Sequence, residues 1–519
     1  MSGALAAAGR HYNAADYLIG RNLKAGRAKK LAYIDDAGDY TYEDLARLVD
    51  ACAHALTGLG LQREQRVLLA LHDTIDFPAA FLGAIKAGIV PIAANTLLTT
   101  ADYDYMLRDS RAIALLVSEP LLPTIGPLLA NLPDLKHVVV SGADGHGHTL
   151  LSTLMREGQA KGAFATAATV ADEACFWLYS SGSTGAPKGT VHVHTSLEAT
   201  AELYGKPVLG IQESDLVFSA AKLFFAYGLG NGLTFPLAVG ATTVLMAERP
   251  TPAAVFKRLR QYRPTIFYGV PTLYAAMLAA PDLPAREEMR LRICCSAGEA
   301  LPEHLGKRWV EHFGVDILDG IGSTEMLHIF LSNRAGEVRY GTTGKPVPGY
   351  EVKLTDEHGD PTPVGEVGDM WIGGPSAAKE YWNQRDKTRG TFQGWWTRSG
   401  DKYSVDADGY YVYAGRSDDM LKVGGIYVSP VEVESALITH PAVLEAAVIG
   451  HEDDDKLVKP KAFVVVKPGV TADEALAAAL KDHVKAKLAV YKYPRWVEFI
   501  GELPKTATGK IQRFKLRGR

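Results

Sequence analysis

Cysteine is scarce in this chain, with four residues among 519. Cys52 and Cys175 stand alone, and Cys294 is followed directly by Cys295 inside an apolar run, so no pair has the spacing of a metal-binding motif. A secreted scaffold held together by disulfides is excluded by the same scarcity. We therefore expect four buried thiols in a protein of a reducing compartment.

Long apolar runs are absent as well. None reaches about 18 residues, which is the length that a membrane-spanning helix needs. Polar residues from Arg10 onward interrupt the N-terminal segment before an apolar core of signal-peptide length is complete. We therefore expect a cytoplasmic protein that makes no membrane contacts.

Neither sign of charge dominates. The 55 lysine and arginine residues nearly balance the 59 aspartate and glutamate residues, which leaves a net charge of −4. Such a balance offers no large positive field for nucleic acid or for an anionic membrane. Chemistry on small molecules is the function class that we expect.

What the chain does have is length and a repeated alternation of helix and strand patterns. Its 519 residues exceed a single domain of ~100–200 residues. Apolar residues recur at helical spacing from Tyr42 to Leu61, where Thr41 and Asp44 resemble a capping box. Short apolar runs typical of buried strands follow at 66–71, 89–92, 114–117, 138–140, 242–246, 265–268 and 292–295. This alternation predicts an α/β fold with two doubly wound sheets.

The pattern changes near residue 338. Short alternating strands between Gly, Pro and Asp turns predict an antiparallel β subdomain that extends to about residue 413. A helix at 429–439, strands at 446–449 and 461–466, and a helix that ends near Leu488 then predict a small α+β domain. We expect a large N-terminal domain, residues 1–416, and a small C-terminal domain, residues 417–519, joined by a polar hinge.

A loop rich in glycine and serine, residues 180–189, lies between two predicted strands. Its glycines permit close backbone approach, its hydroxyls donate hydrogen bonds and Lys188 supplies a positive charge, as a polyphosphate site requires. A flexible Ser/Gly linker would not be flanked by apolar strands. A Walker-type P-loop would close with Gly-Lys-Ser/Thr, whereas Lys188 here lies between Pro187 and Gly189.

Four further motifs follow predicted strands or end the chain. They are Ser296-Ala297-Gly298-Glu299-Ala300, Asp319-Gly320-Ile321-Gly322-Ser323-Thr324-Glu325, Arg398-Ser399-Gly400-Asp401 and Pro504-Lys505-Thr506-Ala507-Thr508-Gly509-Lys510. In this order, and over nearly the whole chain, they resemble the adenylate-forming superfamily of acyl-CoA synthetases, peptide-synthetase adenylation domains and luciferases.

The resemblance implies ATP, Mg²⁺ and coenzyme A as cofactors, and it implies a role for each motif. The polyphosphate would be held by Ser180, Ser181, Gly182, Ser183, Thr184, Gly185 and Lys188. The adenine slot would be lined by Gly298, Glu299, Ala300, Asp319, Gly320 and Ile321. Thr324 would contact the α-phosphate, and Glu325 would bind Mg²⁺ through a hard carboxylate oxygen.

Three other groups complete the implied machinery. Asp401 would accept from the ribose hydroxyls, and Arg416 would bind ribose or phosphate. Lys510 would bridge the substrate carboxylate and the α-phosphate, where charge develops during attack. Two residues depart from the superfamily pattern, since Ile321 replaces an aromatic residue and Arg398 replaces Thr or Ser.

Members of the superfamily first make an acyl-AMP and then rotate a mobile C-terminal domain before the thiol attacks. The resemblance places Asp418 at the hinge of that rotation. It places Gly424, Gly425 and Tyr427 beside the path of coenzyme A.

The acid pocket is indicated by the stretch from Phe224 to Gly228, where peptide-synthetase domains carry an aspartate that pairs with an amino group. No carboxylate stands in this stretch. A buried ammonium would then be unpaired at a cost of several kcal/mol. Small and aromatic residues predict a flat slot for a planar aryl acid; they are Ala226, Tyr227, Ala297 and Gly322, with His328 and Ile329 closing the far end.

Two longer runs, 221–231 and 320–333, resemble the benzoate–CoA and hydroxybenzoate–CoA ligases. The resemblance implies an aryl-CoA ligase of aromatic compound degradation that releases AMP and pyrophosphate. A preference for 4-hydroxybenzoate, an enzyme that loads a separate carrier protein, and a non-catalytic nucleotide-binding regulator stay open as alternatives. So does a homodimer.

Overall fold

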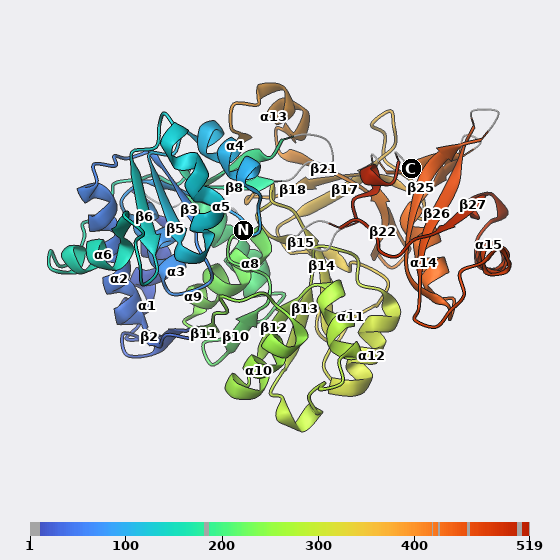
Figure 1. The fold of residues 1–519 in the computed structure, drawn as a ribbon, viewed down its shortest axis with the longest axis horizontal. Helices are drawn as coiled ribbons and strands as arrows, with labels where there is room; N and C mark the ends of the chain where they lie inside the picture. The colour runs from blue at the N-terminus through green and yellow to red at the C-terminus, as the bar shows by residue number, and fades with distance from the viewer. Residues whose placement is uncertain are drawn as a thin grey trace. The chain divides into compact units, whose positions relative to one another are not determined.

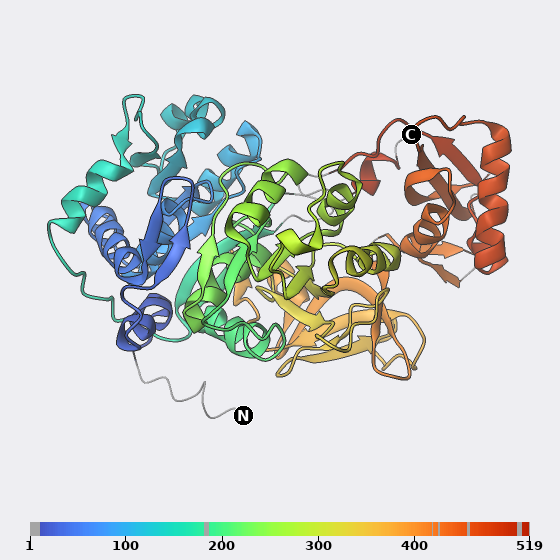
Figure 2. The ribbon, with the colours of Figure 1, turned by 90° about the horizontal axis from the view of Figure 1, so that it is seen from below.

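The computed structural model describes residues 11–180, 186–417, 419–423, 426–453, 457–505 and 511–517. Two compact units make up the chain (Figures 1 and 2). Unit 1 comprises Met1–Glu351 and Ile372–Thr397, and unit 2 comprises Val352–Trp371 and Arg398–Arg519. The boundary expected between residues 416 and 417 falls inside unit 2. A functional division of the chain at that point stays a prediction.

The first sheet of unit 1 has eight strands in the order β19-β9-β8-β4-β3-β5-β6-β7. Neighbouring strands from β8 to β7 are parallel, whereas β9 runs antiparallel to both β8 and β19. The strands are β3 (Arg66–Ala70), β4 (Val90–Ala93), β5 (Ala114–Ser118), β6 (His137–Ser141), β7 (Thr149–Leu150), β8 (Ala174–Ser180), β9 (Lys188–Val193) and β19 (Glu380–Tyr381).

The second sheet has nine strands in the order β16-β15-β14-β13-β12-β10-β11-β1-β2. The strands from β14 to β1 are parallel, and an antiparallel hairpin closes each edge. The strands are β1 (Leu31–Ile34), β2 (Asp39–Thr41), β10 (Leu216–Ser219), β11 (Thr242–Val244), β12 (Ile266–Gly269), β13 (Ile293–Ser296), β14 (Ile317–Gly322), β15 (Ile329–Ser332) and β16 (Lys345–Pro346).

Helices cover these sheets, as the alternation predicts. They are α1 (Arg21–Lys24), α2 (Tyr42–Gly58), α3 (Asp76–Lys86), α4 (Thr100–Ser110), α5 (Leu122–Ile125), α6 (Leu151–Gln159), α7 (His194–Thr200), α8 (Ala226–Leu229), α9 (Phe235–Val239), α10 (Pro252–Tyr262), α11 (Pro271–Ala279), α12 (Glu303–Phe313) and α13 (Arg385–Thr391). Helix α2 begins with the expected capping box, since Thr41 N donates to Asp44 Oδ2 at 2.9 Å and Asp44 N donates to Thr41 Oγ1 at 3.1 Å.

The apolar core of the nine-stranded sheet lies under α10, α11 and α12 (Figure 1). Trp309 of α12 packs edge-on against Tyr274 of α11, and Tyr274 packs on Phe267 of β12. All three side chains are fully buried. Burying an aromatic side chain stabilises a fold by about 2 kcal/mol, so this cluster holds the helices on the sheet whose strand ends carry two predicted motifs.

The antiparallel subdomain and the small α+β domain are also present. One sheet has the order β17-β18-β21-β20, with β22 beside β21; its strands are β17 (Glu351–Thr355), β18 (Gly368–Gly373), β20 (Phe392–Gln393), β21 (Trp396–Val405) and β22 (Tyr411–Arg416). The C-terminal part contains the hairpin β23 (Leu421–Val423) and β24 (Ile426–Val428), the sheet β25 (Val443–Glu452), β26 (Val458–Val466) and β27 (Trp496–Phe499), and the helices α14 (Pro430–Ile438) and α15 (Glu474–Lys487).

Two expectations from composition can be compared with this fold. All four cysteines are buried free thiols, as expected. Within the described part of the chain, no helix combines the length and the apolar character that crossing a bilayer demands.

Candidate active site

The loop rich in glycine and serine connects β8 to β9, as the flanking apolar runs predict. Ser180, the last residue of β8, pairs with Lys188, the first residue of β9. The Ser180 side chain is buried, and its Oγ accepts a hydrogen bond from Thr190 Oγ1 at 3.4 Å. The predicted phosphate ligands Ser181, Gly182, Ser183, Thr184 and Gly185 lie outside the described residues, so their roles stay predictions.

Lys188 and Glu325, which were predicted from separate motifs, lie beside each other. Lys188 Nζ is 3.9 Å from Glu325 Oε1, and the two side chains are only 19% and 16% exposed. The hydroxyl of Tyr381 donates to the same glutamate oxygen at 2.7 Å and accepts from Lys188 Nζ at 3.2 Å. One cation, one carboxylate and a phenol therefore meet at the predicted phosphate site.

Tyr381 belongs to none of the predicted motifs. It lies 193 residues from Lys188 along the chain, and it reaches the site because β19 pairs with the outer edge of β9. No local pattern connects the two residues.

The carboxylate of Glu325 suits a magnesium ion that arrives with a nucleotide. Among the described residues, no three His, Cys, Asp or Glu side chains form a group that could hold a metal by themselves. Magnesium is commonly bound through one or two carboxylates together with substrate phosphates. A single, mostly buried glutamate beside a lysine fits that mode of binding.

His192 likewise belongs to none of the predicted motifs, although it lies on the same face of β9 as Lys188 and Thr190. Alternation along a strand places residues 188, 190 and 192 on one face, which is the pattern that could have identified it. His192 Nε2 lies 2.8 Å from the carbonyl oxygen of Thr324. The ring is fully buried and stacked on Phe176, and burial lowers its pKa to about 4.

The segment that follows β14 is held at several further points. Met326 N donates to Ser323 Oγ at 3.1 Å, and Ala378 N donates to the carbonyl oxygen of Glu325 at 2.7 Å. Ser376 Oγ donates to the carbonyl oxygen of Met326 at 2.7 Å. These bonds fix the backbone that carries Thr324 and Glu325, the last two residues of the motif.

The predicted adenine slot is formed where β13 and β14 end. Ser296 and Asp319 are partners in the register of these parallel strands. The next residues, Ala297 to Ala300, turn away from the sheet through Gly298, whose φ of +96° is a conformation that other residues rarely adopt. Gly320 and Ile321 continue β14 beside them.

Asp319 is the buried carboxyl group of the predicted adenine slot. Its carboxyl group is fully buried, and burial raises its pKa to about 8. Leu301 N lies 3.4 Å from Oδ2, while Oδ1 has no hydrogen-bond partner among the described residues. A buried polar atom of this kind requires a hydrogen-bonding partner, and adenine offers both donors and acceptors.

The predicted acid slot is assembled from α8 and the β14–β15 hairpin. Ala226 and Tyr227 begin α8, and Gly322 pairs with Ile329 across the hairpin. The His328 ring lies 5.6 Å from the Tyr227 ring between centroids. The buried Ala297 follows β13 of the same sheet. The assignment of these residues to an acid slot stays a prediction.

His328 is neutral, and one of its tautomers is selected. Its Nε2 lies 3.2 Å from both the carbonyl oxygen of Tyr227 and Asn231 Oδ1 in the π-helical turn Gly230–Thr234. The carbonyl can only accept, so Nε2 carries the proton and Nδ1 is an acceptor. Burial lowers the pKa of His328 to about 3, and Nδ1 has no partner within the described residues.

Asp401 and Arg416, the predicted ribose ligands, lie in unit 2. They are register partners of β21 and β22, and Arg416 Nη1 is 3.2 Å from Asp401 Oδ1. Tyr427 lies in β24, while Asp418, Gly424, Gly425 and Lys510 lie outside the described residues. The hinge, the coenzyme A path and the catalytic lysine therefore stay predictions.

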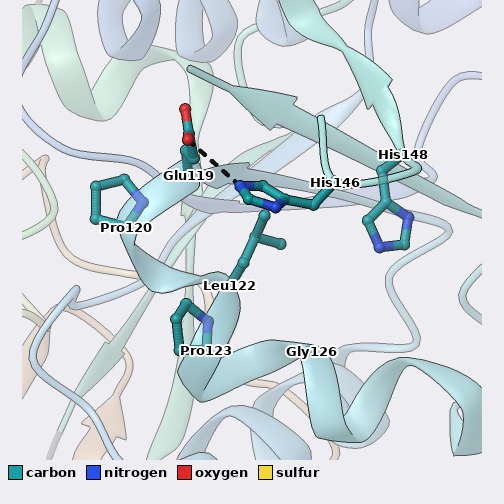
Figure 3. A pocket seen from close by; sticks show the side chains of 7 residues that line it. All are labelled: Glu119, Pro120, Leu122, Pro123, Gly126, His146 and His148. Carbon is teal, nitrogen blue, oxygen red and sulfur yellow. Dashed lines mark hydrogen bonds and ion pairs between the residues drawn. The ribbon is translucent and has the colours of Figure 1, made fainter. Parts of the chain in front are cut away.

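A hollow elsewhere on unit 1 contains none of the predicted residues. It is lined by Glu119, Pro120, Leu122, Pro123, Gly126, His146 and His148 (Figure 3). His146 Nε2 lies 3.4 Å from Glu119 Oε1, and the Glu119 carboxylate also accepts from the backbone of Ala143 and Asp144. These contacts hold the turn at residues 143–146 in place.

Comparison with known proteins agrees with this geometry. Residues 21–382 match the model of the AMP-binding enzyme family, and residues 432–510 match the AMP-binding enzyme C-terminal domain. The chain is 67% identical over 508 residues to benzoate–CoA ligase of Thauera aromatica, which covers 98% of this chain and 96% of that protein. It is 49% identical over 518 residues to 4-hydroxybenzoate–CoA/benzoate–CoA ligase of Rhodopseudomonas palustris, covering 98% and 94%.

The fold has solved counterparts. A benzoate CoA ligase from Burkholderia xenovorans LB400 matches with a TM-score of 0.90 and 58% sequence identity, covering 98% of this chain and 100% of that one.

Proposed function

The chain belongs to the AMP-binding enzyme family, and we propose that it is an ATP-dependent ligase that joins benzoate to coenzyme A. Benzoate and ATP would first form benzoyl-AMP and pyrophosphate, and the thiol would then displace AMP. The observation that carries this proposal is the likeness to benzoate–CoA ligase along nearly the whole chain. The arrangement of lysine, glutamate and acid slot in unit 1 agrees with it.

The first chemical step needs neutralisation of the polyphosphate. Lys188 would bind phosphate oxygens, and Glu325 would bind the Mg²⁺ that compensates their charge. Thr324, whose backbone is held by His192, would contact the α-phosphate. Lys510 would stabilise the charge that develops as the carboxylate attacks, a contribution specific to the transition state.

The choice of acid follows from the lining of the slot. His328 and Ile329 are buried, Tyr227 is partly buried, and none of the three carries a carboxylate that could pair with an amino acid's ammonium group. A flat aryl ring can pack between such side chains, whereas a flexible aliphatic chain would lose conformational entropy there. Benzoate meets these conditions because its unsubstituted ring brings no polar group of its own into the slot.

A panel assay tests the proposal. AMP release is measured for benzoate, ring-substituted benzoates and medium-chain fatty acids, with ATP and coenzyme A present. We expect benzoate to have the highest kcat/KM, with fluorobenzoates within about 1–3 kcal/mol. A tenfold preference for 4-hydroxybenzoate, or faster turnover of fatty acids, contradicts it. Adenylate formation with poor turnover of coenzyme A would instead indicate an enzyme that loads a carrier protein.

The same proposal covers domain motion, location and association. Residues 417–519 would rotate about Asp418 between the two steps, which requires backbone freedom at that position.

A cytoplasmic location is supported by four cysteines that are free thiols. A homodimer stays a prediction, and sedimentation at several concentrations tests it.

A further inference from the structure

The phenol of Tyr381 stands between two groups that the nucleotide needs. Its hydroxyl donates to Glu325 Oε1 at 2.7 Å and accepts from Lys188 Nζ at 3.2 Å. The same ammonium lies 4.3 Å from the centroid of the Tyr381 ring. Tyr381 therefore contacts the cation through both its oxygen and its ring face, and it contacts the carboxylate through its proton.

Tyr381 is itself held rigidly. It lies in β19, where it pairs with Thr190 of β9, and its backbone N donates to Thr388 Oγ1 at 3.0 Å. Its side chain is 3% exposed and packs on the ring of Phe392 at 5.2 Å between centroids. The next residue, Trp382, donates from its backbone N to the carbonyl oxygen of Gly189 at 2.7 Å. The position of the phenol is thus set by the same strand that carries Lys188.

The lysine and the glutamate lie within ion-pair range of each other but beyond the range of a direct hydrogen bond. A direct hydrogen bond between an ammonium and a carboxylate has an N···O distance of about 2.7–2.9 Å, whereas Lys188 Nζ and Glu325 Oε1 are 3.9 Å apart. The Tyr381 hydroxyl bonds to both members. Loss of this bridge would allow the two mostly buried opposite charges to approach to direct hydrogen-bond distance.

We propose that Tyr381 is a positioning residue for Mg²⁺·ATP, one that keeps Lys188 and Glu325 from pairing directly and orients the glutamate for the metal. This inference rests on the proposed function, because it assigns Lys188 to phosphate and Glu325 to Mg²⁺. A hydrogen-bonded group behind a metal ligand commonly changes metal affinity by about 10–100-fold when it is removed. The phenol acts through two other residues and takes part in no bond-making step.

The variant Tyr381→Phe isolates the hydroxyl. It retains the ring face beneath Lys188, the contact with Phe392 and every backbone bond, so the fold should persist. Calorimetric titration of the full chain with ATP in the presence of Mg²⁺ should show at least tenfold weaker binding than in the wild type. Titration with AMP without Mg²⁺ should give an unchanged Kd, which also verifies that the variant is folded.

A matched control is available in Tyr17. Its hydroxyl donates to Glu202 Oε1 at 2.7 Å, and the Arg21 guanidinium lies 4.5 Å from its ring centroid. Tyr17→Phe therefore removes the same kind of phenol–carboxylate bond beside a cation, but at a place with no predicted site residue. Its binding of Mg²⁺·ATP should equal that of the wild type.

The coupling of Tyr381 to Glu325 gives a second measurement. In a Glu325→Gln background there is no carboxylate to orient or to pair with Lys188, so adding Tyr381→Phe should change Mg²⁺·ATP binding less than twofold. A tenfold effect in that background would show that Tyr381 acts through something other than Glu325 and would overturn the proposal.

Two further outcomes decide the matter. If the Tyr381→Phe variant binds Mg²⁺·ATP within twofold of the wild type, the hydroxyl has no positioning role and the residue contributes only to packing. Equal weakening of Mg²⁺·ATP and AMP binding would likewise assign it a structural role. Neither reading depends on benzoate, so a failure of the proposed acid specificity stays distinguishable from a failure of this inference.

Discussion

The side chain of His192 donates from Nε2 to the carbonyl oxygen of Thr324 at 2.8 Å. Since a carbonyl oxygen only accepts, this contact assigns the proton to Nε2 and leaves Nδ1 as an acceptor. Burial favours the neutral ring and lowers its pKa to about 4. The bond joins the strand that begins with Lys188 to the segment that carries Thr324 and Glu325.

Replacing His192 should impair the first half-reaction selectively. His192→Ala leaves the Thr324 carbonyl without its buried donor, a loss of about 1–3 kcal/mol, and it loosens the predicted α-phosphate contact. We expect adenylate formation to fall about tenfold, equivalent to about 1.4 kcal/mol, while conversion of pre-formed benzoyl-AMP and coenzyme A stays within twofold. Quenched-flow measurement of each half-reaction checks this.

The controls for His192 come from the same region of the chain. His192→Gln restores a side-chain donor and should recover most of the lost rate. His194→Ala removes a second buried histidine, whose Nδ1 accepts from Ala14 N at 3.2 Å, and should change stability without separating the half-reactions. A His192→Ala variant with unaltered adenylation would show that Thr324 needs no such support.

His328 should govern how far the acid slot extends. His328→Ala removes a ring that contacts Tyr204, Tyr227 and Phe235, which leaves a cavity and costs benzoate some packing. We expect kcat/KM for benzoate to fall and its ratio to that of para-substituted benzoates to shift in their favour by about tenfold. Steady-state kinetics over the panel of acids measures the ratio. An unchanged ratio would place the para position away from His328.

Asp319 should make stability depend on pH near neutrality. Its pKa of about 8 in the folded state lies above the ordinary value of 3.8, so between these values the folded state binds more protons than the unfolded state. Its contribution to the free energy of unfolding is then fully present below about pH 4 and falls by up to about 1.4 kcal/mol per pH unit as pH rises to 8.

The variant Asp319→Asn removes this titration. Its melting temperature relative to that of the wild type should increase from pH 5 to pH 8, as measured by scanning calorimetry. His192 has a lowered pKa and therefore reduces stability as pH falls from 6.5 to 4. Both proteins contain His192, so its effect cancels when the two melting temperatures are subtracted. A constant difference across this range would mean that Asp319 is ionised throughout.

Lys510 should serve adenylation only. Lys510→Ala should abolish benzoyl-AMP formation and leave thioester formation from pre-formed benzoyl-AMP within a few-fold of the wild type. The reason is that the ammonium stabilises charge on the carboxylate and α-phosphate during attack, and that charge is absent from the second step. Lys505→Ala is a control on the same motif, since Lys505 pairs with Glu445 in unit 2. Adenylation within a few-fold of the wild type in Lys510→Ala would remove the residue from catalysis.

Much of the fold and part of the site follow from local patterns in the sequence. The capping box of Thr41 and Asp44, the parallel strands and the hairpin around the glycine-rich loop all form as predicted. These features depend on the spacing of apolar residues and on turn residues, which a single sequence displays directly. The order of the motifs further predicts one nucleotide site for Lys188 and Glu325, which the structure places beside each other.

Contacts between distant segments were decided only by the tertiary structure. The pairing of β19 with β9 brings Tyr381 to Lys188 across 193 residues, and no periodicity encodes that pairing. The neutral states of His192 and His328 and the raised pKa of Asp319 likewise depend on how completely the assembled sheets exclude water. Sequence determined which chemical groups are available, whereas packing determined which of them meet and in what state of protonation.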